Sequence, residues 1–363
     1  MKTIPKKILI INTFGIGDVL FTTPLVSNIK HIFPDCSIGF VCNARTYALL
    51  EKNPDVDKLF IYERDEFFAV YKKSRLQYWK KVQGLLNDIK REKYDLAFDL
   101  SLNGSMNFFT WRTGIKERVG LNYRNRSRFL TRKIDFDGFE GKHVVDYYLS
   151  LLNLIGHAPR PYEMTLPIST DDERWVDEIW RDKHIKPQDN VIGIVPGGGA
   201  SWGKEAFYRQ WPVENYAKLA DKLIENFSAK IILLGDKNEI ELCSKVQDFM
   251  KHPCLSLLGQ ATLSQYAALL KKCNLVVMND GGPLHIATAA GANVVSLFGP
   301  VDEAVYGPYT SKRQTIVKKG LSCQPCYRRF RMSDCRHLSC LRTLTVDEVF
   351  LKASKAWSEK AIL

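Results

Sequence analysis

The sequence predicts an α/β protein made of two doubly wound, Rossmann-like domains and a C-terminal helix. Its 363 residues, of which 45% are apolar, are enough for two hydrophobic cores. Patterns typical of buried strands alternate with helix patterns in the first half, and the alternation begins again after a proline-rich segment at 159–171. We therefore expect one domain over residues 1–168, a second over 169–345, and a helix over 346–363 that packs back toward the first domain.

The first half carries the pattern of a parallel sheet whose strands are linked by helices. Pro24 falls inside one helix pattern and is expected to bend that helix or loosen its first turns. The glycines at 15 and 17 separate this helix from the strand before it. We expect strands at 7–14, 37–42, 59–62 and 94–100, and helices at 18–33, 75–91 and 144–155.

The second half repeats this organisation. Thr262 with Gln265, and Thr345 with Glu348, form the capping-box pattern that marks a helix start. We expect strands at 190–196, 229–235, 254–259, 274–280 and 293–299, and helices at 213–227, 239–251, 263–273, 284–290 and 346–362.

Composition narrows the class of protein. No apolar run approaches the 18 or more residues of a membrane span, and the first residues lack the pattern of a signal peptide, so we expect a cytoplasmic protein. A formal net charge of +12 favours anionic partners. The nine cysteines are odd in number, and the five at 36, 42, 243, 254 and 273 fall in or beside strand and helix patterns, which is not typical of a disulfide framework.

Ligands of open α/β sheets bind at the carboxyl ends of the strands, so the loops there are the first candidates for a site. The loop at 14–18 begins like a dinucleotide fingerprint, but Leu20 stands where the third glycine belongs, which disfavours a dehydrogenase. Asp18 at the following helix start has two interpretations, a helix N-cap or a functional carboxylate.

The second half opens with a glycine-rich loop at 196–205. It resembles a P-loop from Gly198 onward, but Glu205 replaces the Ser or Thr that would bind Mg²⁺, which disfavours an ATPase. Its amides can still approach an anion, with Lys204 and Arg209 near in sequence to supply positive charge. A glycine-rich turn without a ligand is the alternative.

The segment 279–285, Asn-Asp-Gly-Gly-Pro-Leu-His, follows a buried strand and leads into a helix rich in small residues. Its glycines allow close approach to a ligand, and a helix start offers free amides to a diphosphate. His285 taken alone would be a packed or capping histidine more often than a catalytic one.

Together these motifs resemble the ADP-heptose:lipopolysaccharide heptosyltransferases, glycosyltransferase family nine, of the GT-B fold. The resemblance is carried by Gly-Asp-Val-Leu at 17–20 with Thr-Pro at 23–24, Pro-Gly-Gly-Gly at 196–199, Arg-Gln-Trp-Pro at 209–212, the 279–285 segment, and Leu-Phe-Gly-Pro at 297–300. It implies two facing Rossmann-like domains, the first binding an acceptor and the second a nucleotide sugar. It also implies inverting, metal-independent transfer of a heptose or related sugar, with no cofactor required beyond the donor, ADP-heptose or another nucleoside diphosphate sugar.

The resemblance also implies roles for individual residues. Asp18 matches the family's general base, and Arg209 lies where a basic residue holds the donor phosphates, with Lys204 a second candidate. The nucleotide and diphosphate would be bound by the loop glycines and the 279–285 motif, that is by Gly198, Gly199, Asp280, Gly281, Gly282 and His285. Asp236 lies near the position of an acidic residue that contacts the ribose, and Glu239 competes for that role. The family often has Thr or Ser at the position of Gly281, which leaves backbone amides to bind the phosphate here.

The acceptor implied by the resemblance is a lipid-linked or phosphorylated glycan of the lipopolysaccharide core, reached at the cytoplasmic face of the inner membrane with peripheral membrane contact. Gly17 and the arginines Arg118, Arg124 and Arg126 are candidates to hold it, because aromatic residues accompany this cationic stretch. A solvated loop face is the alternative.

Four cysteines, Cys323, Cys326, Cys335 and Cys340, lie close in sequence with His337 among them. Four sulfurs in so short a loop could hold a structural zinc, but their spacing matches no common zinc module, and reduced thiols are favoured over zinc and over disulfides. Three other functions stay open: a GT-B sugar-nucleotide epimerase, a transferase with another donor, and a basic nucleotide- or RNA-binding module. No nucleic-acid partner is expected, since no RNA- or DNA-binding motif is present.

Overall fold

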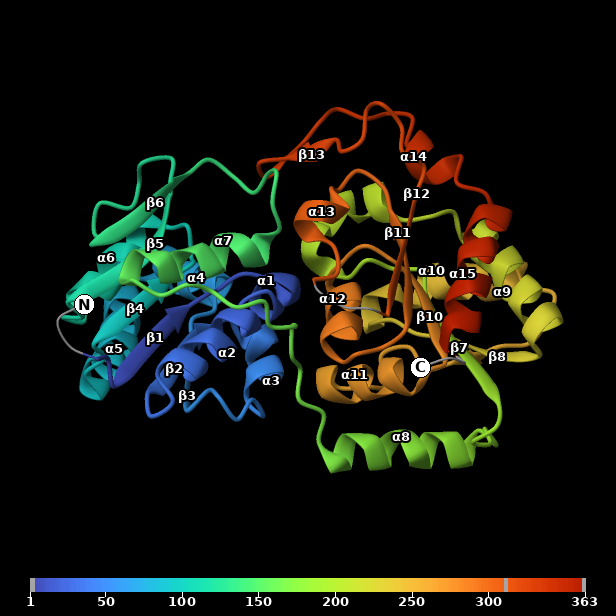
Figure 1. Cartoon of the computed structure of the whole chain (residues 1–363), viewed down its shortest axis with the longest axis horizontal. Helices are drawn as coiled ribbons and strands as arrows, with labels where there is room; N and C mark the ends of the chain where they lie inside the picture. Colours follow the sequence, from blue (N-terminus) through green and yellow to red (C-terminus); the bar gives the residue numbers. More distant parts are fainter. Residues whose placement is uncertain (1–3, 310–312, 361–363) are drawn as a thin grey trace. The chain divides into compact units, whose positions relative to one another are not determined.

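The computed structural model describes residues 4–309 and 313–360, except the side chains of residues 200, 201, 204 and 360. The chain divides into two compact units, Met1–Met164 and Thr165–Leu363 (Figure 1). Each unit holds a six-stranded parallel sheet, ordered β3-β2-β1-β4-β5-β6 in the first and β9-β8-β7-β10-β11-β12 in the second. Both follow the doubly wound 3-2-1-4-5-6 order, which confirms the predicted α/β class.

The first unit contains more helices than the sequence predicts. The helices α4 and α6 and the strands β5 and β6 lie in segments without a predicted element. Its elements are β1 (Lys7–Ile11), α1 (Ile16–Leu20), α2 (Thr23–Ile32), β2 (Ser37–Cys42), η1 (Ala44–Thr46), α3 (Tyr47–Leu50), β3 (Lys58–Ile61), α4 (Arg64–Lys73), α5 (Arg75–Glu92), β4 (Leu96–Asp99), α6 (Gly104–Arg112), β5 (Glu117–Tyr123), β6 (Arg132–Phe136), α7 (Val144–Ser150) and η2 (Leu151–Ile155).

The helix predicted at 18–33 is two helices, α1 and α2, with a break near Thr22. Pro24 lies in the first turn of α2, where the missing N–H costs no hydrogen bond. The break is stabilised by Asn12, whose side-chain amide donates to the carbonyl of Asp18 (3.0 Å) and to the Thr22 hydroxyl (2.9 Å). These hydrogen bonds therefore hold the carbonyl of Asp18 in place within the short helix α1, which follows β1.

The second unit has the predicted alternation, and elements without a prediction are α8, η3, α13, β12, β13, β14 and α14. Its elements are α8 (Thr170–Asp182), β7 (Asn190–Val195), η3 (Ala200–Arg209), α9 (Val213–Phe227), β8 (Ala229–Leu233), η4 (Lys237–Glu239), α10 (Ile240–Phe249), β9 (Leu255–Ser256), α11 (Leu263–Lys272), β10 (Leu275–Asn279), α12 (Gly282–Ala289), β11 (Val294–Phe298), α13 (Glu303–Tyr306), β12 (Gln314–Lys318), β13 (Tyr327–Arg328), β14 (Arg331–Met332), α14 (Ser339–Arg342) and α15 (Val346–Lys360). The capping box at the start of α11 is present as predicted.

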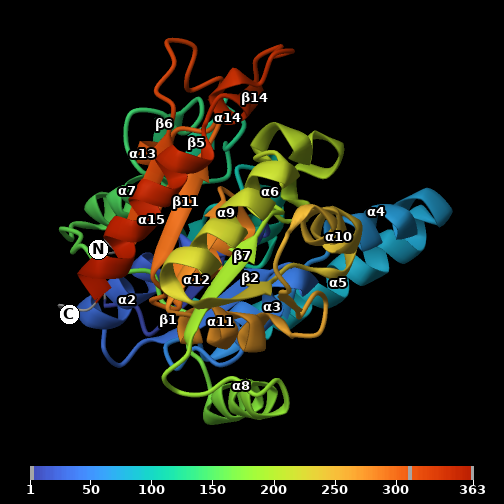
Figure 2. The same cartoon turned by 90° about the vertical axis from the view of Figure 1, so that its right-hand side faces the viewer.

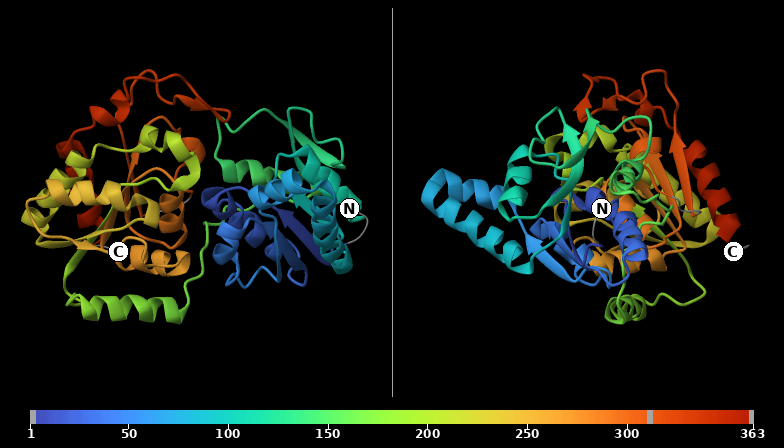
Figure 3. Two further views of the ribbon diagram at one scale, coloured as in Figure 1. Left: turned by 180° about the vertical axis from the view of Figure 1, so that it is seen from behind. Right: turned by 60° about the vertical axis from the view of Figure 1, so that its left-hand side comes forward.

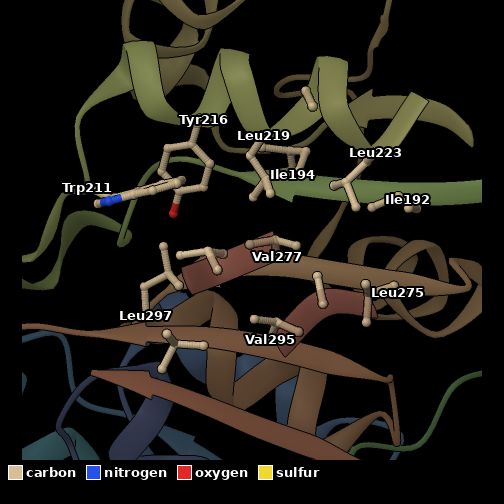
Figure 4. Packing of buried hydrophobic residues seen from close by; sticks show 14 of the residues in the cluster. Ile192, Ile194, Trp211, Tyr216, Leu219, Leu223, Leu275, Val277, Val295 and Leu297 are labelled. Atoms are coloured by element: carbon tan, nitrogen blue, oxygen red, sulfur yellow. The ribbon is translucent and has the colours of Figure 1, made fainter. Parts of the chain in front are cut away.

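The core of the second unit lies between α9 and the centre of its sheet. Leu219 and Leu223 of α9 pack over Ile194 of β7 and Val277 of β10 (Figure 4). The Trp211 ring lies edge-on to Tyr216 with centroids 5.0 Å apart, and its indole N–H donates to the carbonyl of Leu344 (2.9 Å). The buried tryptophan thereby fixes the chain just before α9.

The C-terminal helix α15 packs on the core of the second unit, and its packing toward the first domain stays a prediction. Its buried residues Val349, Ala353 and Ala356 belong to the same core as α9. The aromatic rings of Phe350 and Trp357 stack on Phe227, with centroids 5.8 and 5.2 Å from the Phe227 centroid. The apolar side chains of α15 are therefore buried within the second unit. Across the described residues, no helix is both long and apolar enough to span a bilayer.

Candidate active site

Each sheet has a topological switch point between two neighbouring strands whose connections run in opposite directions. In the first unit it lies between β1 and β4, and in the second between β7 and β10. Ligands of doubly wound sheets bind outside the carboxyl ends of such strands. The segments there are the Gly15–Asp18 loop and Asp99 in the first unit, and the glycine-rich loop and Asp280 in the second.

Asn279, the last residue of β10, holds the three candidate segments of the second unit together. Its side-chain amide donates to the carbonyl of Pro196 (2.5 Å), before the glycine-rich loop. Its side-chain oxygen accepts the backbone N–H of Trp211 (3.2 Å), in the Arg-Gln-Trp-Pro segment. Asn279 is completely buried, so these bonds are shielded from water. One side chain thus assembles motifs that are about 80 residues apart.

The glycine-rich loop and the 279–285 motif touch backbone to backbone. A Cβ atom on Gly281, which has φ 153°, would lie 2.1 Å from the carbonyl oxygen of Gly198. A Cβ atom on Gly199, with φ 76°, would lie 3.2 Å from the Pro283 ring. Glycine at 281 is therefore required by this approach, and a Thr or Ser there would need the backbone to move.

The contact between the backbones of Gly198 and Gly281 predicts that Gly281→Ala weakens nucleotide binding. We expect the two loops to separate, with a loss of at least tenfold in affinity for ADP measured by titration calorimetry. The matched control is Gly291→Ala at the end of α12, where φ is also positive (75°) but nothing lies within 4 Å of the new Cβ atom. The control shares only the backbone strain, on the order of 1–2 kcal/mol. Equal ADP affinity in both variants would contradict the role of the loop contact.

Arg209 and Asp280 form a buried ion pair between these loops. The guanidinium Nη2 lies 2.8 Å from the Asp280 Oδ2, and the side chains are only 10% and 2% exposed. The guanidinium also lies over the Trp202 ring, 4.3 Å from its centroid. Burial raises the pKa of Asp280, and the positive charge of Arg209 opposes the rise. The Arg209 Nε is buried without a hydrogen bond in the described structure, so a donor remains for an anionic ligand.

Glu239 is the acidic residue that lies at the glycine-rich loop. Its carboxylate accepts the N–H of Gly199 (3.1 Å) and the N–H of Asp236 (3.0 Å). Burial raises the pKa of Glu239, while these two hydrogen bonds oppose the rise. Asp236 instead is exposed and caps the short helix η4 through the N–H of Asn238 (2.6 Å). Of the two candidates for a ribose contact, Glu239 is the one joined to the loop.

Gly282 and His285 lie in the first turn of α12, whose N-cap is Gly281. The His285 side chain is buried, with 5% exposed. The Gly282 nitrogen lies 3.9 Å from where a Cβ atom on Gly199 would stand, so the helix start lies against the glycine-rich loop and its free amides are available there. The side chain of Lys204 lies outside the described residues, so its predicted role stays a prediction.

In the first unit, Asp18 lies in the first turn of α1 and is half-buried. The N-cap of this helix is Gly15, with no side-chain cap, so the interpretation of Asp18 as the N-cap was wrong. Gly17 precedes Asp18 in the same turn. The Oδ2 atom of Asp18 lies 3.8 Å from the position that a Cβ atom on Gly15 would occupy.

Asp99, at the carboxyl end of β4, is a buried carboxylate that the sequence analysis missed. It accepts hydrogen bonds from the hydroxyl of Ser101 (2.6 Å) and the amide of Asn107 (2.7 Å). Burial raises its pKa, and these hydrogen bonds oppose the rise. The signal in the sequence was an aspartate near the end of a predicted buried strand, two residues before a serine. Its bonds tie β4 to α6 beside the Asp18 loop.

Comparison with known proteins places this arrangement in a family. Residues 82–337 match glycosyltransferase family 9 (heptosyltransferase). The chain belongs to this family. The match includes every donor-binding candidate residue of the second unit but not Asp18. As a family 9 member, the protein is a glycosyltransferase.

Individual relatives agree with this assignment. The chain is 28% identical over 330 residues to lipooligosaccharide heptosyltransferase 2 of Haemophilus ducreyi, covering 86% of this chain and 88% of the relative. Among solved structures, a family 9 glycosyl transferase from Veillonella parvula has a TM-score of 0.79 at 22% identity, covering 98% and 97% of the two chains. The E. coli ADP-heptose lps heptosyltransferase II has a TM-score of 0.75 at 20% identity, covering 98% and 99%. The predicted GT-B fold class is thereby confirmed.

The arginines expected to hold an acceptor in this family 9 chain lie in different places. Arg118 lies near the amino end of β5, the end opposite the candidate site, and its guanidinium donates to the carbonyls of Lys116 (3.0 Å) and Phe129 (2.7 Å). Burial lowers its pKa. Arg124 and Arg126 are exposed on the loop after β5, at the carboxyl edge of the sheet. The structure therefore separates Arg118 from the other two.

The four cysteines at 323–340 are free thiols. Burial raises the pKa of Cys326 to about 11, so that thiol is protonated at neutral pH. Among the described residues no three His, Cys, Asp or Glu side chains are arranged to hold a metal ion. The geometry thus gives no support to the zinc interpretation of Cys323, Cys326, Cys335 and Cys340.

Proposed function

We propose that this glycosyltransferase moves a heptose from ADP-heptose to the lipopolysaccharide core, with inversion at the anomeric carbon and without a metal ion. The observation that carries the proposal is the contact between the glycine-rich loop and the Asp280–His285 turn, joined by the Arg209–Asp280 pair. The names of the relatives supply the substrates, since they act on lipooligosaccharide or lipopolysaccharide and one is named for ADP-heptose.

In this proposal the second unit binds the donor. The amides of Gly198 and Gly282 receive the diphosphate, and Arg209 stabilises the negative charge that builds up as ADP leaves. Preformed amides and a fixed guanidinium can do this without a divalent cation. Glu239 accepts the ribose hydroxyls, because a carboxylate that already accepts two N–H groups retains lone pairs for two more donors.

The first unit supplies the base. Asp18 takes the proton from an acceptor hydroxyl as that oxygen attacks the anomeric carbon of the sugar. The bond from the anomeric carbon to the ADP phosphate oxygen breaks, ADP leaves as the anion, and the configuration inverts. The proton remains on Asp18 until it is released to solvent. Arg124 and Arg126 are proposed to meet acidic groups of the acceptor, since both are exposed at the same edge of the sheet.

The test is a transfer assay with ADP-, UDP- and GDP-activated sugars and a lipid-linked core acceptor, with and without EDTA. We expect product only with the ADP-sugar, with unchanged rate in EDTA and inverted anomeric configuration by NMR. Thermal unfolding in parallel should show the largest stabilisation by ADP and ADP-heptose, because only the folded state binds them. Epimerised donor without acceptor product, or transfer from UDP-glucose alone, would refute this assignment.

A further inference from the structure

The hairpin formed by α4 and α5 in the first unit carries a continuous strip of aromatic rings. Successive ring centroids are 5.3 Å apart from Tyr71 to Tyr78, 5.5 Å from Tyr78 to Trp79, and 6.3 Å from Trp79 to Phe109 of α6. Beyond Phe109 the strip continues through Phe108 to Trp111 (5.7 Å). It thus connects three consecutive helices.

Several large apolar side chains of the hairpin and of α6 are exposed to water. The exposed fractions are 55% for Phe68, 67% for Leu76, 52% for Trp79 and 46% for Trp111. The hairpin projects from the rest of the first unit, as two views from different sides show (Figures 2 and 3). Large apolar side chains gathered on a projecting element are costly in a molecule that stays in water, and they mark an interaction surface.

The same surface is strongly cationic. Between residues 71 and 81 the sequence has five cations and no carboxylate. Lys72, Lys73, Arg75 and Lys80 are exposed. Of the five, only Lys81 forms an ion pair in the described part of the chain, with Glu66. Arg112 and Arg128 extend the positive charge to the Trp111 end.

We propose that this surface, the α4–α5 hairpin with Trp111, docks the enzyme on an anionic phospholipid bilayer. Tryptophan and tyrosine are favoured at the headgroup level, where one part of the ring is apolar and the other is hydrated. Exposed Leu76 and Phe68 insert at the acyl boundary, while the surrounding lysines and arginines meet the lipid phosphates. Shallow insertion of apolar side chains and attraction to lipid phosphates are each weak, but together they give the stable, reversible attachment of a peripheral membrane protein.

The ring geometry favours a bilayer over single-stranded nucleic acid, which also binds basic aromatic surfaces. Base stacking requires exposed ring faces. Here the rings of Tyr71 and Tyr78, Tyr78 and Trp79, and Trp79 and Phe109 cross at 79°, 72° and 83°, so each ring edge lies against a neighbouring ring face. Leu76, the most exposed apolar residue of the surface, has no π-face to offer a base.

The test is sedimentation of the full chain with vesicles of phosphatidylethanolamine and phosphatidylglycerol, compared with pure phosphatidylcholine vesicles. We expect binding to the anionic vesicles only, weakened by 0.5 M salt. The triple variant Lys72→Glu, Lys73→Glu, Arg75→Glu and the double variant Phe68→Ser, Leu76→Ser should each need at least tenfold more lipid for half-maximal binding. No nucleotide sugar is present, so this result is separate from that of the transfer assay.

The matched control carries the same charge change outside this hairpin, at the exposed cations Lys183→Glu, Lys218→Glu and Lys352→Glu. It should bind vesicles within threefold of the parent chain. All variants should keep the parental melting temperature within a few degrees and the transfer rate on a delipidated, water-soluble acceptor. Equal loss of binding in the control would mean that net charge alone acts and would overturn the proposal. Failure of the parent to bind anionic vesicles would also overturn it, as would tight RNA binding or self-association through this surface in place of vesicle binding.

Discussion

Replacing Asp18 with Asn is expected to lower the turnover of sugar transfer by roughly 10²–10⁴-fold, the contribution of a positioned general base. The amide has nearly the same shape as the carboxylate but cannot accept the proton of the attacking hydroxyl. The break between α1 and α2 should be kept, because Asn12 and Thr22 donate to the carbonyl of Asp18, which the substitution leaves in place. The measurement is steady-state turnover with saturating donor and acceptor.

Two further measurements make this result specific. ADP affinity by calorimetry should stay within about threefold of the parent value, since Asp18 belongs to the first unit and the donor is assigned to the second. Glu63→Gln removes another carboxylate from the carboxyl edge of the same sheet, one that accepts only the Ala44 N–H (3.3 Å), and should keep nearly full activity. Turnover of Asp18→Asn within tenfold of the parent would show that the base is another group.

The second large effect is expected for Arg209→Met, which should impair both stability and donor binding. The substitution leaves the Asp280 carboxylate, 2% exposed, without its cation. An uncompensated buried charge costs about 3–5 kcal/mol of unfolding free energy. The loss of a charge-assisted hydrogen bond to the diphosphate should weaken ADP binding roughly 10- to 100-fold. Urea unfolding and titration calorimetry measure the two quantities.

The double variant Arg209→Met, Asp280→Asn separates these two effects. With both charges removed, the desolvation cost disappears, and we expect most of the lost unfolding free energy to return. ADP binding should stay weak, because the guanidinium is still absent. A control at an exposed ion pair, Arg174→Met beside Asp171, should cost less than about 1 kcal/mol. Full recovery of ADP affinity in the double variant would show that Arg209 acts only by neutralising Asp280.

The accuracy of the sequence predictions follows the strength of the local pattern. The strand at 37–42 and the helix at 213–227 have the predicted bounds, because a fully buried strand and a long amphipathic helix leave unambiguous signals. Helix α4 was missed because Phe67 is its only buried residue, so its pattern resembles a solvated loop. Helix α8 was also missed: its first two residues fall in the predicted linker, and no element was predicted for the rest of it. Its stripe of Asp172, Val176 and Trp180 becomes a helix face when α11 covers it, with Ser264 bonded to Asp172 (3.0 Å).

The candidate site also contains residues that the sequence pattern could identify and residues that only the coordinates identified. The motifs around Asp18, Gly198 and Asp280 could be found in the sequence, because anion binding requires glycines and helix starts directly after buried strands. Asp99 was not found, since an aspartate at a strand end has no distinctive spacing. The choice of Glu239 over Asp236 also needed coordinates, because both follow β8 and only their hydrogen bonds differ.

The amino-acid sequence by itself determined that this chain is a two-sheet α/β protein with candidate binding motifs in the loops after the strands, because hydrophobic periodicity and glycine placement are local properties. Only the tertiary structure decided which loops meet. Strand order brings β10 beside β7, and Asn279 then bonds Pro196 and Trp211 across distances in sequence that no local pattern encodes. Helix α15 shows the same difference. Its apolar stripe could be recognised in the sequence, but only the structure shows that this stripe packs on the core beneath α9.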